Sequence, residues 1–181
     1  MTQRFVEHPL IRKGTVESRS YQERIAGECL KANTLVCLPT GLGKTVVAAL
    51  VIAERLLRFP KGRVVVMAPT RPLTLQHHRN FTEILTIDSD SMVSITGVTP
   101  PDERVGLWNR RVVFSTPQVF MNDLITGRLE LPDVVLLVFD EAHRAVGDYP
   151  YTFIGPRYAQ EQTPLILGLT ASPGSTKEAI A

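Results

Sequence analysis

The sequence of 181 residues lacks several features that would assign its class at once. It has only two cysteines, Cys29 and Cys37, and no histidine stands beside either. We therefore expect neither a disulfide framework nor a zinc site, and both cysteines should be small buried residues. No apolar stretch reaches about 18 residues without a charge, and the first nine residues hold no apolar signal core. These absences favour an intracellular protein without a membrane span, cytoplasmic or, in a eukaryote, nuclear.

An excess of charge of one sign is also absent. The formal net charge is +2, which permits an acidic partner without indicating one. Hydrophobic residues make up 44% of the chain and charged residues 21%, which is ordinary for a globular domain large enough to form a core.

Apolar and amphipathic segments alternate along the chain. Six apolar segments are typical of β-strands: 34–38, 63–68, 92–96, 111–115, 134–139 and 165–169. Helical patterns lie at 18–31, 45–59, 72–85, 100–109, 117–126 and 152–160. Residues 134–139 are apolar without alternation, which is typical of a central strand covered on both faces. We expect an α/β fold over residues 18–181, with a mainly parallel sheet between two layers of helices. Residues 1–17 should form a polar, extended arm.

The strongest chemical signal lies between the first expected strand and the helix after it. Gly41 and Gly43 let backbone N–H groups approach phosphate oxygens without a Cβ in the way. Lys44 supplies a positive charge for the β- and γ-phosphates, and Thr45 a hydroxyl for Mg²⁺. Leu38 departs from the standard pattern, because it stands where the first glycine would be. A tight turn with a chance Lys-Thr pair is the alternative, but strand, loop and helix occur in the order that a phosphate loop requires. The expected nucleotide-binding loop is Leu38, Pro39, Thr40, Gly41, Leu42, Gly43, Lys44 and Thr45.

Two acids, Asp140 and Glu141, end the most hydrophobic strand. Acids at such a place are costly without a partner, and a magnesium nucleotide is a suitable one. Asp140 would then bind Mg²⁺, while Glu141 would orient and deprotonate the attacking water. An acidic helix cap is the alternative. Lys44, Asp140 and Glu141 are thus the catalytic candidates, and His143 is a possible relay.

Three further loops each follow an expected strand and join a hydroxyl or amide to a helix start. Such loops suit phosphate contacts with a nucleic-acid backbone, although ordinary connections with proline in the first helical turn look similar. The nucleic-acid candidates are Thr70, Arg71, Thr96, Gly97, Thr116, Pro117 and Gln118. Thr170 and Ser172 place two more hydroxyls after the last strand, near the acid pair.

Two other polar features are less informative. The Gln22 amide matches the donor and acceptor of an adenine edge, but taken alone it is better interpreted as a solvated helix residue. His77 and His78 are adjacent on a helix, so their side chains point apart and cannot both face one metal. We expect them to be a solvated pair.

Together these motifs resemble those of superfamily 2 helicases. The matching residues are Tyr21-Gln22, 38–45, 68–73, 116–118, 140–143 and 169–173. The loop Leu-Pro-Thr-Gly-Leu-Gly-Lys-Thr, Asn122-Asp123-Leu124 and residues 140–149 are similar to the archaeal Hef fork-DNA helicase/nuclease and the Fanconi anaemia M translocase family. RIG-I-like and Dicer helicases share much of this set.

The resemblance implies a RecA-like domain that uses ATP and Mg²⁺ to drive a motor on forked or branched DNA, in fork restart and repair. It also implies that Gln22 reads adenine and that His143, Thr170 and Ser172 couple the nucleotide and nucleic-acid sites. Such motors have a second RecA-like domain with arginine fingers, and the pattern Gln-x-x-Gly-Arg-x-x-Arg is not found in this sequence. We therefore expect the first motor domain alone, with the second as its partner. By itself it should bind ATP weakly, hydrolyse it slowly and unwind nothing.

Other classes remain open at this stage. One is a nucleotide-gated nucleic-acid binding module, and another is an RNA-directed ATPase of the RIG-I or Dicer kind. A P-loop kinase would need a basic lid after the phosphate loop, and the sequence shows none.

Overall fold

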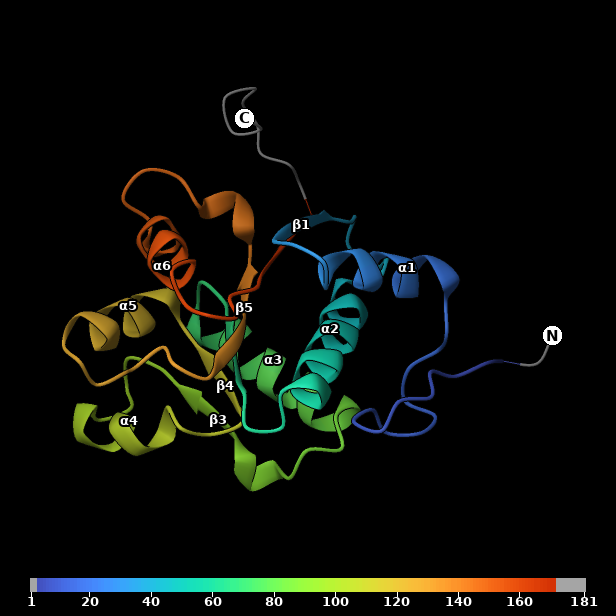
Figure 1. The fold of residues 1–181 in the computed structure, drawn as a ribbon, viewed down its shortest axis with the longest axis horizontal. Coiled ribbons are helices and arrows are strands. Elements are labelled where there is room, and N and C mark those ends of the chain that lie inside the picture. Colours follow the sequence, from blue (N-terminus) through green and yellow to red (C-terminus); the bar gives the residue numbers. More distant parts are fainter. Residues whose placement is uncertain (1–2, 172–181) are drawn as a thin grey trace.

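One six-stranded sheet runs through the molecule in the computed structural model, which describes residues 3–171 (Figure 1). Its strand order is β1-β6-β5-β2-β4-β3, and every neighbouring pair is parallel. This confirms the expected α/β fold. The strands are β1 (Thr34–Cys37), β2 (Arg63–Met67), β3 (Met92–Ile95), β4 (Val112–Ser115), β5 (Val134–Asp140) and β6 (Ile166–Thr170).

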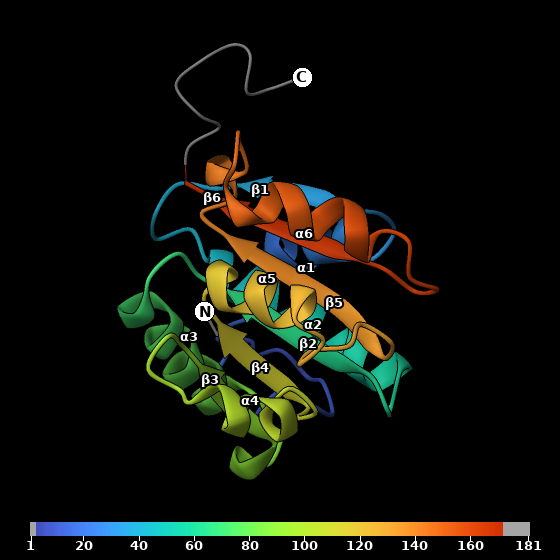
Figure 2. The same cartoon turned by 90° about the vertical axis from the view of Figure 1, so that its left-hand side faces the viewer.

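Within residues 3–171, three helices cover each face of the sheet. In Figure 1, α4, α5 and α6 lie to the left of the strands and α1 and α2 to the right, and Figure 2 shows α4, α5 and α6 in front of the strands. The helices are α1 (Ser20–Cys29), α2 (Lys44–Arg58), α3 (Arg71–Ile84), α4 (Pro101–Leu107), α5 (Pro117–Ile125) and α6 (Pro150–Tyr158). Short 3₁₀ turns occupy Ser89–Ser91 and Ala142–Arg144.

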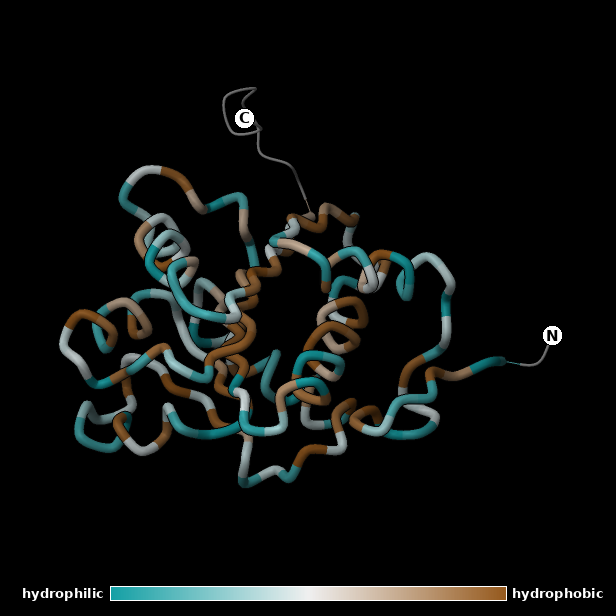
Figure 3. Tube along the Cα trace, viewed as in Figure 1, coloured by the Kyte–Doolittle hydropathy of each residue, from teal (hydrophilic) through white to brown (hydrophobic). Residues whose placement is uncertain are grey.

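The core consists of two apolar layers, one on each side of the sheet. One joins inward-facing strand residues to α1, α2 and α3, and the other joins the alternate strand residues to α5 and α6. All seven residues of β5 are buried, as its unbroken apolar run predicts. Figure 3 shows hydrophobic colour concentrated along the central strands. Within residues 3–171, no helix combines the length and apolar character needed to cross a bilayer.

The N-terminal segment, expected to be an extended polar arm, contacts the core. Ile11 and Val16 are only 2% and 3% exposed and join the α1–α2–α3 layer. The Arg12 N–H donates to the Ile84 carbonyl at 2.8 Å, and Thr86 N–H donates to Leu10 at 3.0 Å. Two apolar side chains thus fix this segment beside the end of α3.

The expectation that both cysteines are buried is wrong for one of them. Cys29 is buried on α1, but Cys37 is exposed. Because β1 is an edge strand of the sheet, Leu35 and Cys37 both remain exposed.

Candidate functional site

The loop between β1 and α2 has the backbone that an anion-binding turn requires. Gly41 and Gly43 have φ of 89° and 87°, in the left-handed region that favours glycine. Helix α2 starts at Lys44 with no side-chain cap and no acid in its first turn. The first backbone N–H groups of α2 therefore have no side-chain cap as acceptor. This arrangement suits a phosphate group.

Two side chains at the start of α1, Tyr21 and Gln22, form hydrogen bonds to this loop. The Tyr21 hydroxyl donates to the Leu42 carbonyl at 2.9 Å, and Gln22 Nε2 donates to the same oxygen at 3.2 Å. A Cβ at Gly43 would collide with the Gln22 amide. Gln22 is 3% exposed, so the interpretation of it as a solvated residue is wrong. The structure brings it to the loop, where its proposed role in reading adenine stays a prediction.

The acid pair lies two strands away from the loop and level with it. Cys37 pairs with Thr170 on β6, and Leu169 of the same strand pairs with Asp140 on β5. Two strand spacings separate β1 from β5, roughly 10 Å. Loop and acids therefore flank the end of β6, at the carboxyl edge where ligands of such sheets bind.

A chain of polar contacts joins the acid pair to β6. Glu141 has a left-handed backbone, with φ of 53°. Its Oε2 lies 3.4 Å from Nε2 of His143, and Nδ1 of His143 lies 2.9 Å from Oγ1 of Thr170. The structure thus assembles three of the predicted residues. Ser172 lies outside the described residues.

The carboxylate of Asp140 has two partners. Its Oδ1 accepts the Glu141 N–H at 2.9 Å, and its Oδ2 lies 2.7 Å from Nε2 of His77. The expectation of a solvated histidine pair is therefore wrong. His78 points elsewhere, stacking on Phe114 with 4.9 Å between ring centroids. Only the inference that the two rings diverge holds.

The predicted nucleic-acid loops follow β2, β3 and β4, which form the other half of the sheet. Met67 and Ile95 both pair with Ser115, so the three loops start level. Their exposure differs: Thr70, Arg71, Gly97 and Gln118 are exposed, Thr116 is half-buried, and Thr96 and Pro117 are buried. Thr96 is only 3% exposed, so it offers little surface to a ligand.

A groove of about 680 Å³ extends this edge beyond the predicted loops. One wall carries Thr116, Pro117 and Gln118, and the other carries Arg144, Val146, Asp148 and Tyr149 from the segment after the acid pair. Sequence reasoning did not select the second wall. Its residues lie within the 140–149 segment that resembles the Hef family, but that resemblance gave them no role in a site.

The residues at the phosphate loop fit a magnesium nucleotide. Thr45 and Asp140 offer a hydroxyl and a carboxylate, the hard oxygen ligands that Mg²⁺ prefers. Among residues 3–171, no group of three or more His, Cys, Asp or Glu side chains could enclose a metal. A metal here would therefore depend on phosphate oxygens as well, as is usual for Mg²⁺.

Comparison with known proteins supports this interpretation. Residues 19–180 match the DEAD/DEAH box helicase family, so the chain belongs to that family. It is 42% identical over 180 residues to the Drosophila melanogaster DEAD-box ATP-dependent DNA helicase Fancm, covering 96% of this chain and 12% of that protein. It is 43% identical over 169 residues to the Arabidopsis thaliana DEAD-box ATP-dependent RNA helicase FANCM, covering 92% and 13%.

The fold also has a solved counterpart. The crystal structure of the Pyrococcus furiosus Hef helicase domain matches with a TM-score of 0.90 and 46% identity, over 94% of this chain and 37% of that one. This confirms the RecA-like architecture and the resemblance to Hef and Fanconi anaemia M proteins. The chain spans less than a quarter of the length of the curated relatives that it matches.

Proposed function

We propose that this chain is the nucleotide-binding domain of an ATP-driven motor that, in the intact protein, acts on forked or branched DNA in DNA repair. The observation that carries the proposal is the placement of the phosphate loop and the acid pair on either side of the β6 end. The names of its relatives point the same way.

Each side chain has a proposed task in this site. Lys44 and the loop amides bind the phosphates, and Gln22 recognises adenine. Thr45 and Asp140 hold Mg²⁺, which neutralises phosphate charge when bound. Glu141 accepts a proton from the attacking water, within reach of His143.

The other half of the sheet supports a nucleic-acid backbone site. The loops after β2, β3 and β4 start level, and the groove beside Gln118 adds Arg144. Hydroxyls, backbone N–H groups and an arginine contact phosphates but carry no base code. Binding should therefore weaken with salt and vary little with base sequence.

A second motor domain in the intact protein is part of the proposal. Phosphoryl transfer builds negative charge on the γ-phosphate, which an arginine finger offsets by about 10³–10⁵ in rate. We therefore propose that the 181 residues alone bind ATP weakly and turn it over slowly. An RNA-directed motor is the second candidate, because at least two relatives are named RNA helicases.

The test is steady-state ATP hydrolysis by the intact protein and by the 181-residue chain. Forked DNA, linear duplex, single-stranded DNA and RNA are added in parallel. We expect stimulation of the intact protein, strongest with forked DNA, and little turnover by the chain alone. Turnover by the chain near 1 s⁻¹, within the common enzyme range of about 1–10³ s⁻¹, would contradict the need for a second domain. Stimulation by RNA alone would favour the second candidate.

A further inference from the structure

Helix α3 packs on β2, β3 and β4, the half of the sheet whose loops are the predicted nucleic-acid site. It begins directly after Thr70, in a predicted nucleic-acid loop, and its cap is the Thr70 side chain, which accepts the Leu73 N–H. His77 follows Arg71 by six residues, roughly 9 Å along the helix. Yet the polar contact of His77 is with Asp140, at the end of β5 in the other half of the sheet. This helix therefore connects the Thr70–Arg71 loop with the proposed metal ligand.

The contact between His77 and Asp140 is short and shielded. Nε2 lies 2.7 Å from Oδ2, and the side chains are 15% and 12% exposed. The His77 ring also lies near the buried Phe81, with 6.0 Å between centroids. The 2.7 Å between Nε2 and Oδ2 is typical of a hydrogen bond to a charged acceptor. The histidine is thus held where it can orient the carboxylate.

The ring nitrogens of His77 have unequal surroundings. Nδ1 is buried and has no hydrogen-bond partner within residues 3–171. A hydrogen on Nδ1 would be a buried donor without an acceptor, which is unfavourable. A hydrogen on Nε2 instead points at Asp140, so the neutral Nε2–H form satisfies the carboxylate and leaves no buried donor unpaired.

The carboxylate is consequently held on both sides. Oδ1 accepts the Glu141 N–H and Oδ2 accepts His77 Nε2–H. Each oxygen of a carboxylate can accept more than one interaction, so both keep capacity for a metal or its water. Without His77, Oδ2 would lose the one side-chain partner that it has within residues 3–171.

We propose that His77 is a positioning residue that orients Asp140 for Mg²⁺ and thereby ties helix α3, and the Thr70–Arg71 loop at its start, to the nucleotide site. This inference rests on the proposed function, because it takes Asp140 as a metal ligand. Hydrogen-bonded partners of metal ligands typically contribute 10–100-fold to metal affinity or activity.

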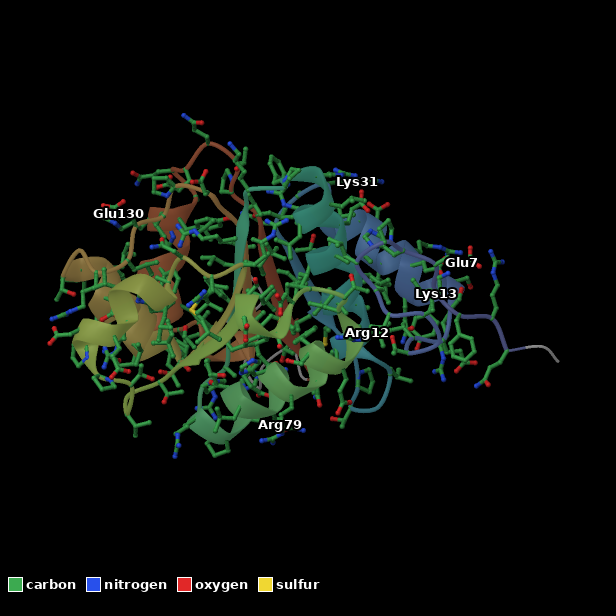
Figure 4. The ribbon with its side chains drawn as sticks, turned by 90° about the horizontal axis from the view of Figure 1, so that it is seen from below. Glu7, Arg12, Lys13, Lys31, Arg79 and Glu130 are labelled. Atoms are coloured by element: carbon green, nitrogen blue, oxygen red, sulfur yellow. The ribbon has the colours of Figure 1, made fainter. Side chains whose placement is uncertain are left out.

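The experiment uses the intact protein and three variants. His77→Ala removes the hydrogen bond, and His77→Gln restores a donor at similar reach. Arg79→Gln is the matched control, because Arg79 is exposed and points outward from the same helix (Figure 4). Binding of a fluorescent ATP analogue is titrated with Mg²⁺ and with a chelator in its place. ATP hydrolysis is then measured against Mg²⁺, with and without forked DNA.

We expect His77→Ala to reduce the gain in nucleotide affinity from Mg²⁺ by about 10–100-fold, and to raise the Mg²⁺ needed for hydrolysis by a similar factor. Affinity in chelator should not change. His77→Gln should recover most of the effect, Arg79→Gln should match wild type, and stimulation by DNA should fall in His77→Ala only.

Three outcomes would overturn the inference. An unchanged Mg²⁺ effect in His77→Ala would remove the positioning role, and so would a uniform loss in Mg²⁺ and in chelator, which indicates a structural role. Failure of the glutamine to rescue would show that the hydrogen bond is not the cause. If wild-type nucleotide affinity itself did not depend on Mg²⁺, the metal role of Asp140 in the proposed function would fail first, and this inference with it.

Discussion

Nδ1 of His143 lies 2.9 Å from Oγ1 of Thr170, so a residue after β5 and the last residue of β6 share one hydrogen bond. Thr170→Val removes this hydroxyl with little change in shape. Because a hydrogen bond contributes about 0.5–1.5 kcal/mol, we expect hydrolysis by the intact protein to fall by about 2–13-fold while ATP affinity stays unchanged. Thr170→Ser, which keeps a hydroxyl, should retain activity. Steady-state rates and a nucleotide titration measure both quantities, and equal rates in the valine and serine variants would contradict the coupling.

Lys44→Ala should weaken nucleotide binding and leave the fold intact. The side chain is half-buried at the start of α2, where a charge-assisted contact with phosphate contributes about 1.5–3 kcal/mol. That corresponds to an affinity loss of roughly 10–150-fold. A fluorescent ATP analogue is titrated at low salt, and Lys31→Ala, at an exposed position just after α1, is the control. Equal affinity for wild type and Lys44→Ala would remove Lys44 from the phosphate site.

Glu141→Gln in the intact protein should bind Mg²⁺-ATP but lose turnover. The amide keeps the size of the side chain and cannot accept a proton. General-base catalysis contributes about 10²–10⁴-fold, so we expect a rate loss of that order. Glu130→Gln, an exposed side chain on a loop in Figure 4, should hydrolyse ATP at the wild-type rate. Loss of ATP binding with normal residual turnover in Glu141→Gln would refute the role of base.

Asp123→Ala should destabilise the fold more than any exposed charge change. Asp123 is fully buried and accepts hydrogen bonds from Arg104 at 3.1 Å and from the Trp108 indole at 2.8 Å. Removing it leaves a mostly buried arginine without its partner, which typically costs about 3–5 kcal/mol of unfolding free energy. Glu28→Ala breaks an exposed ion pair with Lys31 and should change stability little. Urea unfolding of both variants measures the difference.

Stability should decline in mild acid partly through His78. Burial lowers the pKa of this imidazole, so the folded state takes up a proton less readily than the unfolded chain. The folding stability that depends on neutral His78 is complete above the ordinary histidine pKa of about 6.5. This stability is lost as the pH falls from there through the lower folded-state pKa. His78→Phe keeps an aromatic ring beside Phe114 and should show a shallower decline. Identical slopes of unfolding free energy against pH would rule this contribution out.

The sequence predicts most of the fold because the sheet is parallel and buried. Strands covered on both faces need unbroken apolar runs, and β2, β4 and β5 stand out for that reason. The edge strand β1 is not covered on both faces, so an apolar residue in it can stay exposed, as Cys37 does. Helix α6 begins at Pro150, two residues before the predicted start. Proline suits the first turn of a helix, but the residues beside it do not indicate that a helix starts there.

The sequence predicts those parts of the site whose functional residues are neighbours in the chain. The phosphate loop and the acid pair are each continuous in sequence, and the geometry at both is local. The contact between His77 and Asp140 joins residues 63 positions apart, and only the register of β2 against β5 brings α3 over the acid. The sequence also does not predict the burial of Ile11 and Val16, because this burial depends on contacts with distant segments. A single apolar residue in a polar segment does not indicate what it packs against.

The sheet order has a consequence for how the domain reaches its folded state. Strand β1 lies early in the chain, yet within residues 3–171 its one neighbour in the sheet is β6, the last strand that the structure describes. Pairings between such distant segments form slowly, because a long loop must close before the contact stabilises it. During synthesis β1, which leads into the phosphate loop, would thus lack its strand neighbour until β6 had emerged. Nucleotide binding would then report completion of folding, and nascent chains that end before Ile166 should not bind ATP.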